Sequence, residues 1–488
     1  MTLKTKEEYL ESLKEQKPII YMYGKKIENR VEHPLIKPQL DVFGLTYEFP
    51  HRPEYRELTT AISHISGKRI NRFTHIHQSR EDLLNKIRMT RMYCRYCVCI
   101  QRCMAVDALN ALTIICHEID EKHGTDYYKR LLKYIRFFQE EDVAATCAMT
   151  DVKGDRSLRP ADQPDPDMYL RVVKETDEGI TVRGAKCHTT AAIASNELIV
   201  MPTRAMRDKD KDYAVAFAIP VDAEGIKFIC RSTALARKRI LDFPFRSKWA
   251  VTETVTIFDD VFVPWDRVFM CGEWEYAGLA AELFAIYHRH SYCGCKPAVT
   301  DMLVGTAALL AEYNGVENAS HIRSKLTDMA CTAEQMWACG VAASCLGEPR
   351  GPGTYVPNIT LVNIGKYIAG THIYDEIYRV HDIGGGLIIT CPSDEDYFNP
   401  ETKSYLEKYL KGKADIPTEH RIRAFKLAED LTAYGFAGWL MVASCHGGGS
   451  PEAQKITIYR SYDFERRKKI AKCLAGICDL SEFPEFEL

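Results

Sequence analysis

A block of short β-rich runs between about residues 141 and 270 constrains the fold of this chain more than any other feature. The runs include GITVRGAKCHTT, DYAVAFAIPV and TVTIFDDVFVPWDRVFM, and Gly, Pro or Asp residues punctuate them. β-Branched and aromatic residues between such breakers are typical of strands. The sequence on either side has helical apolar spacing instead. The order helical, β, helical predicts one compact α+β architecture in three parts, residues 1–140, 141–275 and 276–488.

The composition excludes several classes of protein. The 488 residues carry a formal net charge of −3, so no basic surface for nucleic acid is expected. The N-terminal sequence MTLKTKEEYLESLKEQKP predicts an amphipathic helix, not a signal peptide. No uncharged run approaches the ~18 residues that a membrane span needs. We therefore expect a cytoplasmic protein that binds neither nucleic acid nor membrane, with its 18 cysteines reduced.

Four of these cysteines fall within the eleven residues YCRYCVCIQRC, at Cys94, Cys97, Cys99 and Cys103. A capping box at Ser79-x-x-Asp82 and helical spacing up to Gly124 predict that this segment lies on one long helix. On a continuous helix Cys99 and Cys103 would share a face. Zinc knuckles and the C-x2-C-x2-C iron–sulfur spacing are both absent here. The helix is therefore expected to supply two metal ligands, with two more from elsewhere.

The segment YHRHSYCGCKP offers those further ligands. It places His288, His290, Cys293 and Cys295 within eight residues. A second segment that holds both His and Cys favours a metal or cluster site, but the spacing alone leaves zinc and iron–sulfur both open.

The chain resembles the 4-hydroxybutyryl-CoA dehydratases, within the wider 4-hydroxyphenylacetate 3-monooxygenase family. The resemblance runs nearly end to end, through YMYGKKIENRVEHPLIKP, INRFTHIHQS, AMTDVKGDRSLRP, VRGAKCHTT, YHRHSYCGCK, DIGGGLIITCPSDEDYF and HGGGSPEAQ. It implies an acyl-CoA dehydrogenase-like fold with an N-terminal helical domain, a middle β-barrel-like flavin domain and a C-terminal helical bundle. It also implies a 4Fe–4S cluster, whose ligands would be Cys99, Cys103, His288 and Cys295. Cys94, Cys97 and Cys293 would then only pack beside it.

The same resemblance implies an FAD site. The flavin would be lined by residues of TDVKGDR and of the strand that ends in CHTT, namely Thr150, Asp151, Gly154, Asp155, Arg156, His188 and Thr190. A glycine turn would contact the FAD of a neighbouring subunit, which implies a homotetramer built as a dimer of dimers. The matching residues are Gly384, Gly385 and Gly386.

The implied activity is radical dehydration of a 4-hydroxyacyl-CoA to a crotonyl-CoA type product, with possible isomerisation of vinylacetyl-CoA. Here His288 would ligate iron and also act as the base. The other catalytic candidates are Glu253, Tyr292, Lys296 and Gln101. One position departs from the pattern, because Ala443 stands where the dehydratases carry a second functional glutamate. A different hydroxyacyl substrate is therefore a second interpretation.

Two further hypotheses remain. One is a flavin-dependent aromatic monooxygenase whose cysteines bind nothing. The other is a non-catalytic relative stabilised by zinc. The dehydratase hypothesis additionally predicts oxygen sensitivity, because an iron with an easily displaced ligand is exposed to oxidation, and hence an anaerobic or microaerobic setting.

Overall fold

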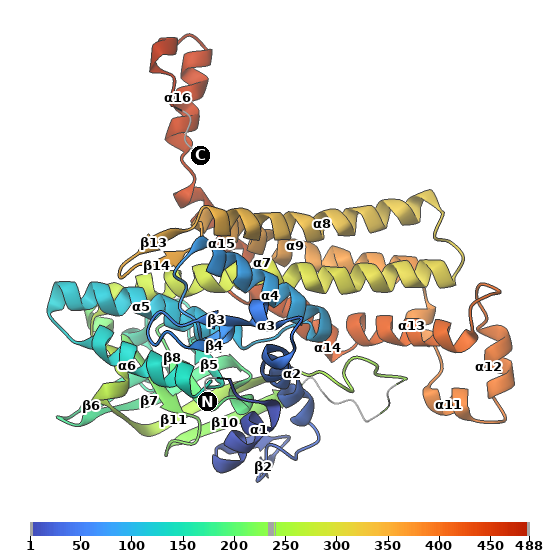
Figure 1. Cartoon of the computed structure of the whole chain (residues 1–488), viewed down its shortest axis with the longest axis horizontal. Helices are drawn as coiled ribbons and strands as arrows, with labels where there is room; N and C mark the ends of the chain where they lie inside the picture. Colours follow the sequence, from blue (N-terminus) through green and yellow to red (C-terminus); the bar gives the residue numbers. More distant parts are fainter. Residues whose placement is uncertain (1–2, 233–238, 240, 486–488) are drawn as a thin grey trace.

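The computed structural model describes residues 3–232, 239 and 241–485 and follows the predicted order of helices, strands and helices (Figure 1). The long helices α7 (Trp274–Tyr313), α8 (Ser320–Cys345) and α9 (Ile359–Gly384) lie alongside one another above the sheets. The other helices of the described residues are α1 Lys6–Glu15, α2 Lys37–Glu48, α3 Arg56–Thr59, α4 Arg80–Cys97, α5 Cys103–His123, α6 Tyr127–Glu140, α10 Leu387–Thr390, α11 Asp394–Phe398, α12 Lys403–Tyr409, α13 Thr418–Thr432, α14 Gly435–His446, α15 Pro451–Ser461 and α16 Phe464–Leu474.

Each β-rich run of the sequence forms a strand, in two main sheets. The six-stranded sheet has the order β2 (Lys25–Ile27), β1 (Ile19–Met22), β10 (Ile226–Ser232), β11 (Thr252–Pro264), β7 (Gly179–Thr190) and β6 (Arg171–Glu175). The four-stranded sheet has the order β12 (Val268–Cys271), β9 (Val215–Pro220), β8 (Glu197–Val200) and β5 (Ala145–Ala148). Two hairpins complete the strands, β3 (Thr60–Ile62) with β4 (Arg69–Asn71) and β13 (Glu348–Arg350) with β14 (Thr354–Val356).

The middle part is therefore two open sheets and, within the described residues, not a closed barrel. β1 runs parallel to β10 and β5 runs parallel to β8, while the other pairs in the two sheets are antiparallel. The strands β1 and β2 come from the N-terminal part of the chain and extend the larger sheet at one edge. The α+β class is confirmed, and the barrel-like description of the middle domain is corrected to paired open sheets.

The predicted long helix through the cysteine segment is interrupted. Its start and end are confirmed, because the Ser79 hydroxyl accepts a hydrogen bond from the Asp82 amide at 3.1 Å and Gly124 ends α5 with φ 67°. Between them α4 ends at Cys97, and α5 begins at Cys103. Cys99 lies in the connection and Cys103 in the first turn of α5, so the prediction that both sulfurs share one helix face is wrong.

The predicted amphipathic N-terminal helix is confirmed as α1, which has a capping box at Thr5 and Glu8 and buries Tyr9 and Leu13. None of the helices in the described part of the chain combines the length and the apolar content that crossing a membrane requires.

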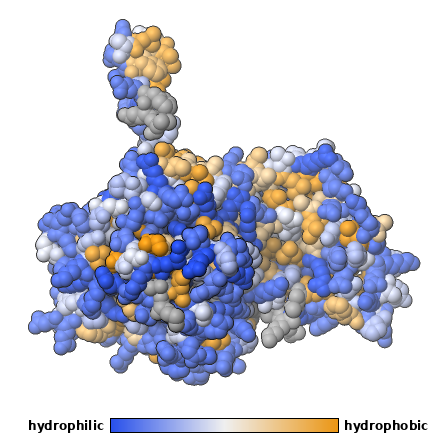
Figure 2. Space-filling model, viewed as in Figure 1, coloured by the Kyte–Doolittle hydropathy of each residue, from blue (hydrophilic) through white to orange (hydrophobic). Residues whose placement is uncertain are grey.

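The C-terminal segment leaves the body of the molecule as an arm, which we define as residues 462–485 (Figure 1). α15 packs on α9, and α16 then projects away from it. Hydrophobic side chains gather at the outer end of the arm (Figure 2), where Leu474, Ile477 and Leu480 are about two-thirds to three-quarters exposed. A disulfide joins Cys473 to Cys478 within the arm, which corrects the expectation that all cysteines are reduced. The other 16 cysteines are free thiols.

Candidate active site

The connection between α4 and α5 has an unusual backbone. Val98 has φ 68° and Gln101 has φ 62°, and both residues are buried. Positive φ is rare for a residue other than Gly and unfavourable for a β-branched one, so this conformation is maintained by its surroundings. The connection places Cys103 beside His288 and Cys295 of α7.

Buried anchors hold this connection in place. The Arg102 guanidinium is 1% exposed, pairs with the Asp142 carboxylate at 2.5 Å and donates to Thr46 Oγ1 at 2.9 Å. Next to it, Gln101 Oε1 accepts a hydrogen bond from Gln39 Nε2 at 2.7 Å. Gln39 Oε1 in turn accepts one from the Thr252 amide at 2.8 Å, which ties the connection to β11. Gln101 and Arg102, the two residues that directly precede Cys103, therefore fix the position of the Cys103 thiol.

Four sulfurs gather where α4, the connection, α5 and α7 meet. The ionisation of Cys99 and of Cys103 is disfavoured by burial and by the charge of Cys295, and burial raises the pKa of Cys99 to about 12. The Cys94 thiol donates a hydrogen bond to Cys295, which is the main cause of the lowered pKa of the Cys295 thiol. Cys94 therefore packs beside Cys295, and Cys97 and Cys293 are also fully buried.

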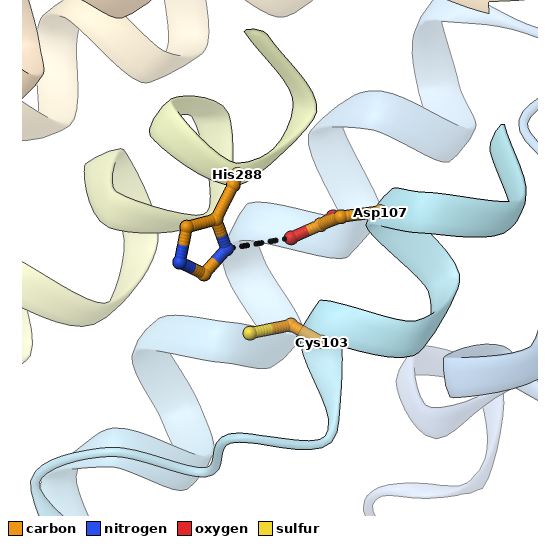
Figure 3. A group of neighbouring side chains, drawn as sticks. All are labelled: Cys103, Asp107 and His288. Carbon is orange, nitrogen blue, oxygen red and sulfur yellow. Dashed lines mark hydrogen bonds and ion pairs between the residues drawn. The ribbon is translucent and has the colours of Figure 1, made fainter. Parts of the chain in front are cut away.

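An imidazole and a carboxylate complete this cluster (Figure 3). One ligand atom from each of Cys103, Asp107 and His288 lies within 4.8 Å of the others. His288 Nδ1 is 3.0 Å from Asp107 Oδ2, and Cys103 points toward the same ring. His290, the other candidate of the YHRHSYCGCKP segment, instead shares a hydrogen bond with Ser344 Oγ at 2.8 Å. Sequence reasoning missed Asp107, whose only signal was an acidic residue within an apolar helical stretch.

Tyr292 lies one helical turn after His288 on α7 and faces the end of α14. Its hydroxyl donates to the Ala443 carbonyl at 3.0 Å. The ammonium groups of Lys296 and Lys366 lie 5.2 Å and 5.0 Å from its ring centroid, on cation–π contacts. Lys366 Nζ donates to the Ser444 carbonyl at 2.8 Å, and burial together with the charge of Lys296 lowers the pKa of Lys366 to about 7. Sequence reasoning missed Lys366 as well.

The HGGGS turn packs directly on this face of α7. A Cβ added at Gly447 would lie 1.9 Å from Tyr292 Oη, and one at Gly448 would lie 3.5 Å from His288 Cδ2. The Arg289 guanidinium donates to the Gly448 carbonyl at 2.8 Å. The glycines therefore allow the backbone of this turn to approach the side chains of α7 closely.

Glu253 on β11 faces the same region from the sheet side. Its carboxylate accepts hydrogen bonds from Thr190 Oγ1 at 2.8 Å and from Trp439 Nε1 at 2.9 Å. Burial raises its pKa to about 7, against the opposing effect of these two donors. Trp439 belongs to α14, the helix that carries Ala443 in its last turn and ends at His446, where the HGGGS turn begins. Glu253 and Tyr292 therefore both contact α14, through Trp439 and Ala443. The Thr190 hydroxyl, the predicted flavin contact, donates its hydrogen bond to Glu253.

The remaining flavin candidates lie along one end of β7. Asp151 is buried and pairs with Lys186 Nζ at 2.6 Å, and the Thr150 carbonyl accepts a hydrogen bond from the Cys187 amide at 2.8 Å. Beyond this anchor Gly154, Asp155 and Arg156 are exposed, as is His188, whose φ is 56°. The loop of residues 150–156 is thus anchored to β7 at Thr150 and Asp151, and its residues 154–156 are exposed to solvent.

The glycine triplet lies apart from these residues, at the end of α9. Gly384 is the last residue of α9, and Gly385 has φ 71°. A Cβ added at Gly385 or Gly386 would meet open space within the chain. Within one chain, this turn therefore presents bare backbone outward.

Two family models together span nearly the whole chain. The model described as 4-hydroxyphenylacetate 3-hydroxylase N terminal matches residues 5–270, and the one described as 4-hydroxyphenylacetate 3-hydroxylase C terminal matches residues 277–476. The chain belongs to the 4-hydroxyphenylacetate 3-hydroxylase family. The fold is the acyl-CoA dehydrogenase-like α+β fold of that family, as predicted.

Relatives within the 4-hydroxyphenylacetate 3-hydroxylase family fall on two branches. A 4-hydroxybutyryl-CoA dehydratase/vinylacetyl-CoA-Δ-isomerase of Clostridium aminobutyricum is 41% identical over 97% of this chain and 100% of its own. The structure of an oxygen-tolerant archaeal 4-hydroxybutyryl-CoA dehydratase from N. maritimus matches with a TM-score of 0.93 and 39% identity, covering 100% and 97% of the two chains. The oxygenase component of a 4-hydroxyphenylacetate 3-monooxygenase complexed with FAD has a TM-score of 0.88 and 27% identity, covering 98% and 99%.

Proposed function

We propose that this protein is a hydro-lyase that dehydrates a 4-hydroxyacyl-CoA, with 4-hydroxybutyryl-CoA as the first substrate to test, and that it also isomerises vinylacetyl-CoA. The observation that supports the proposal is the grouping of Cys103, Asp107 and His288, which each offer a ligand atom within 4.8 Å of the others, in a region where Cys295 packs in the same cluster as Cys103. The 41% identity with the dehydratase of C. aminobutyricum, against 27% with the FAD-bound oxygenase, supports the same choice.

The donor set of this site fits a 4Fe–4S cluster. Cys99, Cys103 and Cys295 would supply three thiolates, and His288 would supply an imidazole. Burial disfavours a negative charge on the Cys99 and Cys103 thiols unless a cation neutralises it. When bound, such a cluster supplies an iron that can accept a hydroxyl group as a Lewis acid.

An FAD would bind between the sheet and the helices. Thr150, Asp151, Gly154, Asp155 and Arg156 would line it from the loop, and His188 and Thr190 from β7. The exposed backbone after the anchored Asp151 fits an extended polar cofactor. When bound, the flavin supplies one-electron transfer, which makes the hydrogens at C3 of the acyl chain acidic enough to remove.

Proton transfer then falls to the protein's own residues. Converting a 4-hydroxybutyryl to a crotonyl thioester removes one hydrogen from C2 and one from C3, adds one at C4, and releases the C4 hydroxyl with the remaining proton as water. A group with a pKa near 7 can both accept and donate at neutral pH. Glu253 has this property, with a pKa of about 7. His288 on α7 and Glu253 on β11 would transfer these protons to and from the acyl chain, each from its own side of the site.

Tyr292, Lys296 and Gln101 would position the acyl chain. Within the described part of the chain, Gln101 Nε2 is buried without a hydrogen-bond partner, while Lys296 Nζ lies over the Tyr292 ring. A buried donor without a partner is costly, so Gln101 Nε2 is suited to bind a polar group of the substrate. Ala443 offers Tyr292 only its carbonyl, so this site lacks the second glutamate and relies on Glu253 and His288 for proton transfer.

Several parts of the assembly would require neighbouring subunits. We propose a homotetramer, supported by the outward-facing backbone of Gly385 and Gly386 and by the exposed apolar end of the arm. In this arrangement the glycine turn of one subunit would contact the FAD of another. A cytoplasmic location agrees with a cluster held by thiolates.

The decisive test is anaerobic. Purified protein replete with iron and FAD is incubated with 4-hydroxybutyryl-CoA, and the acyl-CoA mass is followed for the loss of one water. Glu253→Gln, which keeps the shape but cannot transfer the proton, is the matched variant and should abolish most of the loss. An unchanged mass with both cofactors present would reject 4-hydroxybutyryl-CoA as the substrate. Hydroxylation of 4-hydroxyphenylacetate with reduced flavin would favour the oxygenase branch instead.

Air exposure is a separate test. We propose that the iron site is oxygen-sensitive, although the related enzyme from N. maritimus is described as oxygen-tolerant. Iron content and activity are measured before and after prolonged exposure to air. Full retention of both would contradict the proposed sensitivity while leaving the dehydratase activity intact.

A further inference from the structure

Asp107 on α5 occupies the centre of a polar network that is buried except for the edge of His288, whose side chain is 13% exposed. Its carboxylate is 0% exposed and receives three side chains from two other helices. Lys86 Nζ on α4 pairs with it closely, and Ser291 Oγ on α7 donates to its two oxygens at 3.0 Å and 3.2 Å. The third partner is His288 Nδ1, at 3.0 Å. A buried charge that is paired and hydrogen-bonded in this way keeps a fixed orientation.

This network determines which nitrogen of His288 carries the proton. Lys86 Nζ and Ser291 Oγ both donate to the Asp107 carboxylate, and a carboxylate only accepts hydrogen bonds. The short contact with His288 therefore requires a proton on Nδ1. In the neutral imidazole the lone pair then lies on Nε2, the nitrogen that faces away from Asp107.

The same helix face of α5 also presents Cys103. Cys103 and Asp107 are four residues apart in α5, so their side chains project on the same side. Figure 3 shows both pointing toward the His288 ring, which comes from α7. One face of one helix thus carries a thiol of the site and the carboxylate that orients the imidazole of the site.

We infer that Asp107 is the positioning residue of His288: its hydrogen bond fixes the Nδ1–H tautomer and leaves the Nε2 lone pair free to bind, while Lys86 and Ser291 hold the Asp107 carboxylate in place. This inference deepens the proposed function, because a histidine that binds iron and then accepts a proton needs a free Nε2 lone pair. Carboxylates that orient metal-binding histidines in this way typically change metal affinity 10–100-fold when they are mutated.

The test is Asp107→Asn, because the two carboxamide atoms differ. Lys86 can only donate, so the Asn oxygen will face Lys86 and the NH2 group will face His288, while the Ser291 hydroxyl can donate to the oxygen or accept from the NH2 group. That NH2 group donates to Nδ1 and moves the proton to Nε2. Ser291→Ala is the matched control, since it removes one hydrogen bond to Asp107 and leaves the contact with His288. Asp107→Glu keeps the carboxylate and tests whether packing alone matters.

The primary readout needs no cluster. Magic-angle-spinning NMR of cluster-free protein labelled with 15N-histidine reports the protonated nitrogen, and the His288 signal is assigned by its loss in His288→Gln. We expect Nδ1–H in the wild type, in Ser291→Ala and in Asp107→Glu, and Nε2–H in Asp107→Asn. Nε2–H in the wild type, or Nδ1–H retained in Asp107→Asn, would overturn the inference. So would an Nε2–H tautomer in Asp107→Glu, which would mean that shape and not charge sets the tautomer.

A second readout uses the loaded protein. Pulsed EPR of the reduced cluster, with 15N-histidine, measures the nitrogen coupling of an iron-bound imidazole. The wild type and Ser291→Ala should show this coupling, and Asp107→Asn should lose it together with at least tenfold in iron affinity. An unchanged coupling in Asp107→Asn contradicts the inference. A wild type that binds no cluster contradicts the proposed function instead, and the NMR result then still decides the role of Asp107.

Discussion

Replacing Arg102 with Met tests whether the buried ion pair maintains the connection that carries Cys99 and Cys103. The Arg102 and Asp142 side chains are each 1% exposed, and the guanidinium also stacks 4.2 Å from the centroid of the Tyr47 ring. Removing one partner of such a pair costs about 3–5 kcal/mol, because the other charge stays buried. At about 2.1 cal/mol/K per residue, unfolding the whole chain has an entropy of about 1 kcal/mol/K. Arg102→Met should therefore lower the Tm by about 3–5 °C.

The assay is thermal unfolding followed by circular dichroism, at one scan rate for all variants. The control is the double variant Arg102→Met/Asp142→Asn, which removes the stranded charge. If desolvated charge is the cause, the double variant should recover more than half of the loss, because well-packed neutral replacements of a buried pair are often close to neutral. A Tm of Arg102→Met within 1 °C of the wild type would refute the reasoning. A double variant as unstable as the single one would assign the loss to packing instead.

Three further predictions concern other parts of the molecule. Glu253 has a pKa of about 7 in the folded state against 4.5 in the unfolded state, so between these pH values the folded state binds more protons. The free energy of unfolding should therefore fall by up to about 3 kcal/mol as the pH rises from 4.5 to 7. The Tm of Glu253→Gln, measured across that range, should lack this fall, and an equal fall in both proteins would contradict the assignment. Gly447→Ala should lower the Tm by about 1–3 °C, because the added Cβ would overlap Tyr292 Oη and overpacking costs about 1–3 kcal/mol. The control is Gly438→Ala on α14, where the added Cβ meets open space, so the Tm should not fall. Removing residues 462–488 should convert the proposed tetramer into a smaller oligomer, measured by light scattering, and an unchanged mass would exclude the arm from the subunit interface.

The fold was largely predictable because its local signals agree with its tertiary packing. The strands at 179–190, 215–220 and 252–264 alternate or bury their apolar residues as their runs suggest, and the caps at Ser79 and Gly124 mark real helix ends. The break between α4 and α5 was not predictable, because Val98 adopts a positive φ that no local preference signals. Long-range contacts impose that conformation.

The candidate site was predictable where residue chemistry is distinctive and hidden where it is not. Cysteine and histidine drew attention to residues 94–103 and 288–295. Asp107 and Lys366 lie within helical stretches whose sequences show no distinctive pattern. Asp107 contacts His288, 181 residues away, and Lys366 contacts Ser444, 78 residues away. Pairings over such separations have no signature in a single sequence.

The packing of the HGGGS turn onto α7 has a consequence for how the protein matures. Tyr292, Cys103 and Cys295 are each 7% exposed once this turn is seated, and Gly447 leaves no room above the Tyr292 hydroxyl. If the proposed cluster binds here, it would therefore have to be inserted before α14 and this turn pack onto α7, so the order of cofactor insertion and helix docking would decide how much of the protein becomes complete.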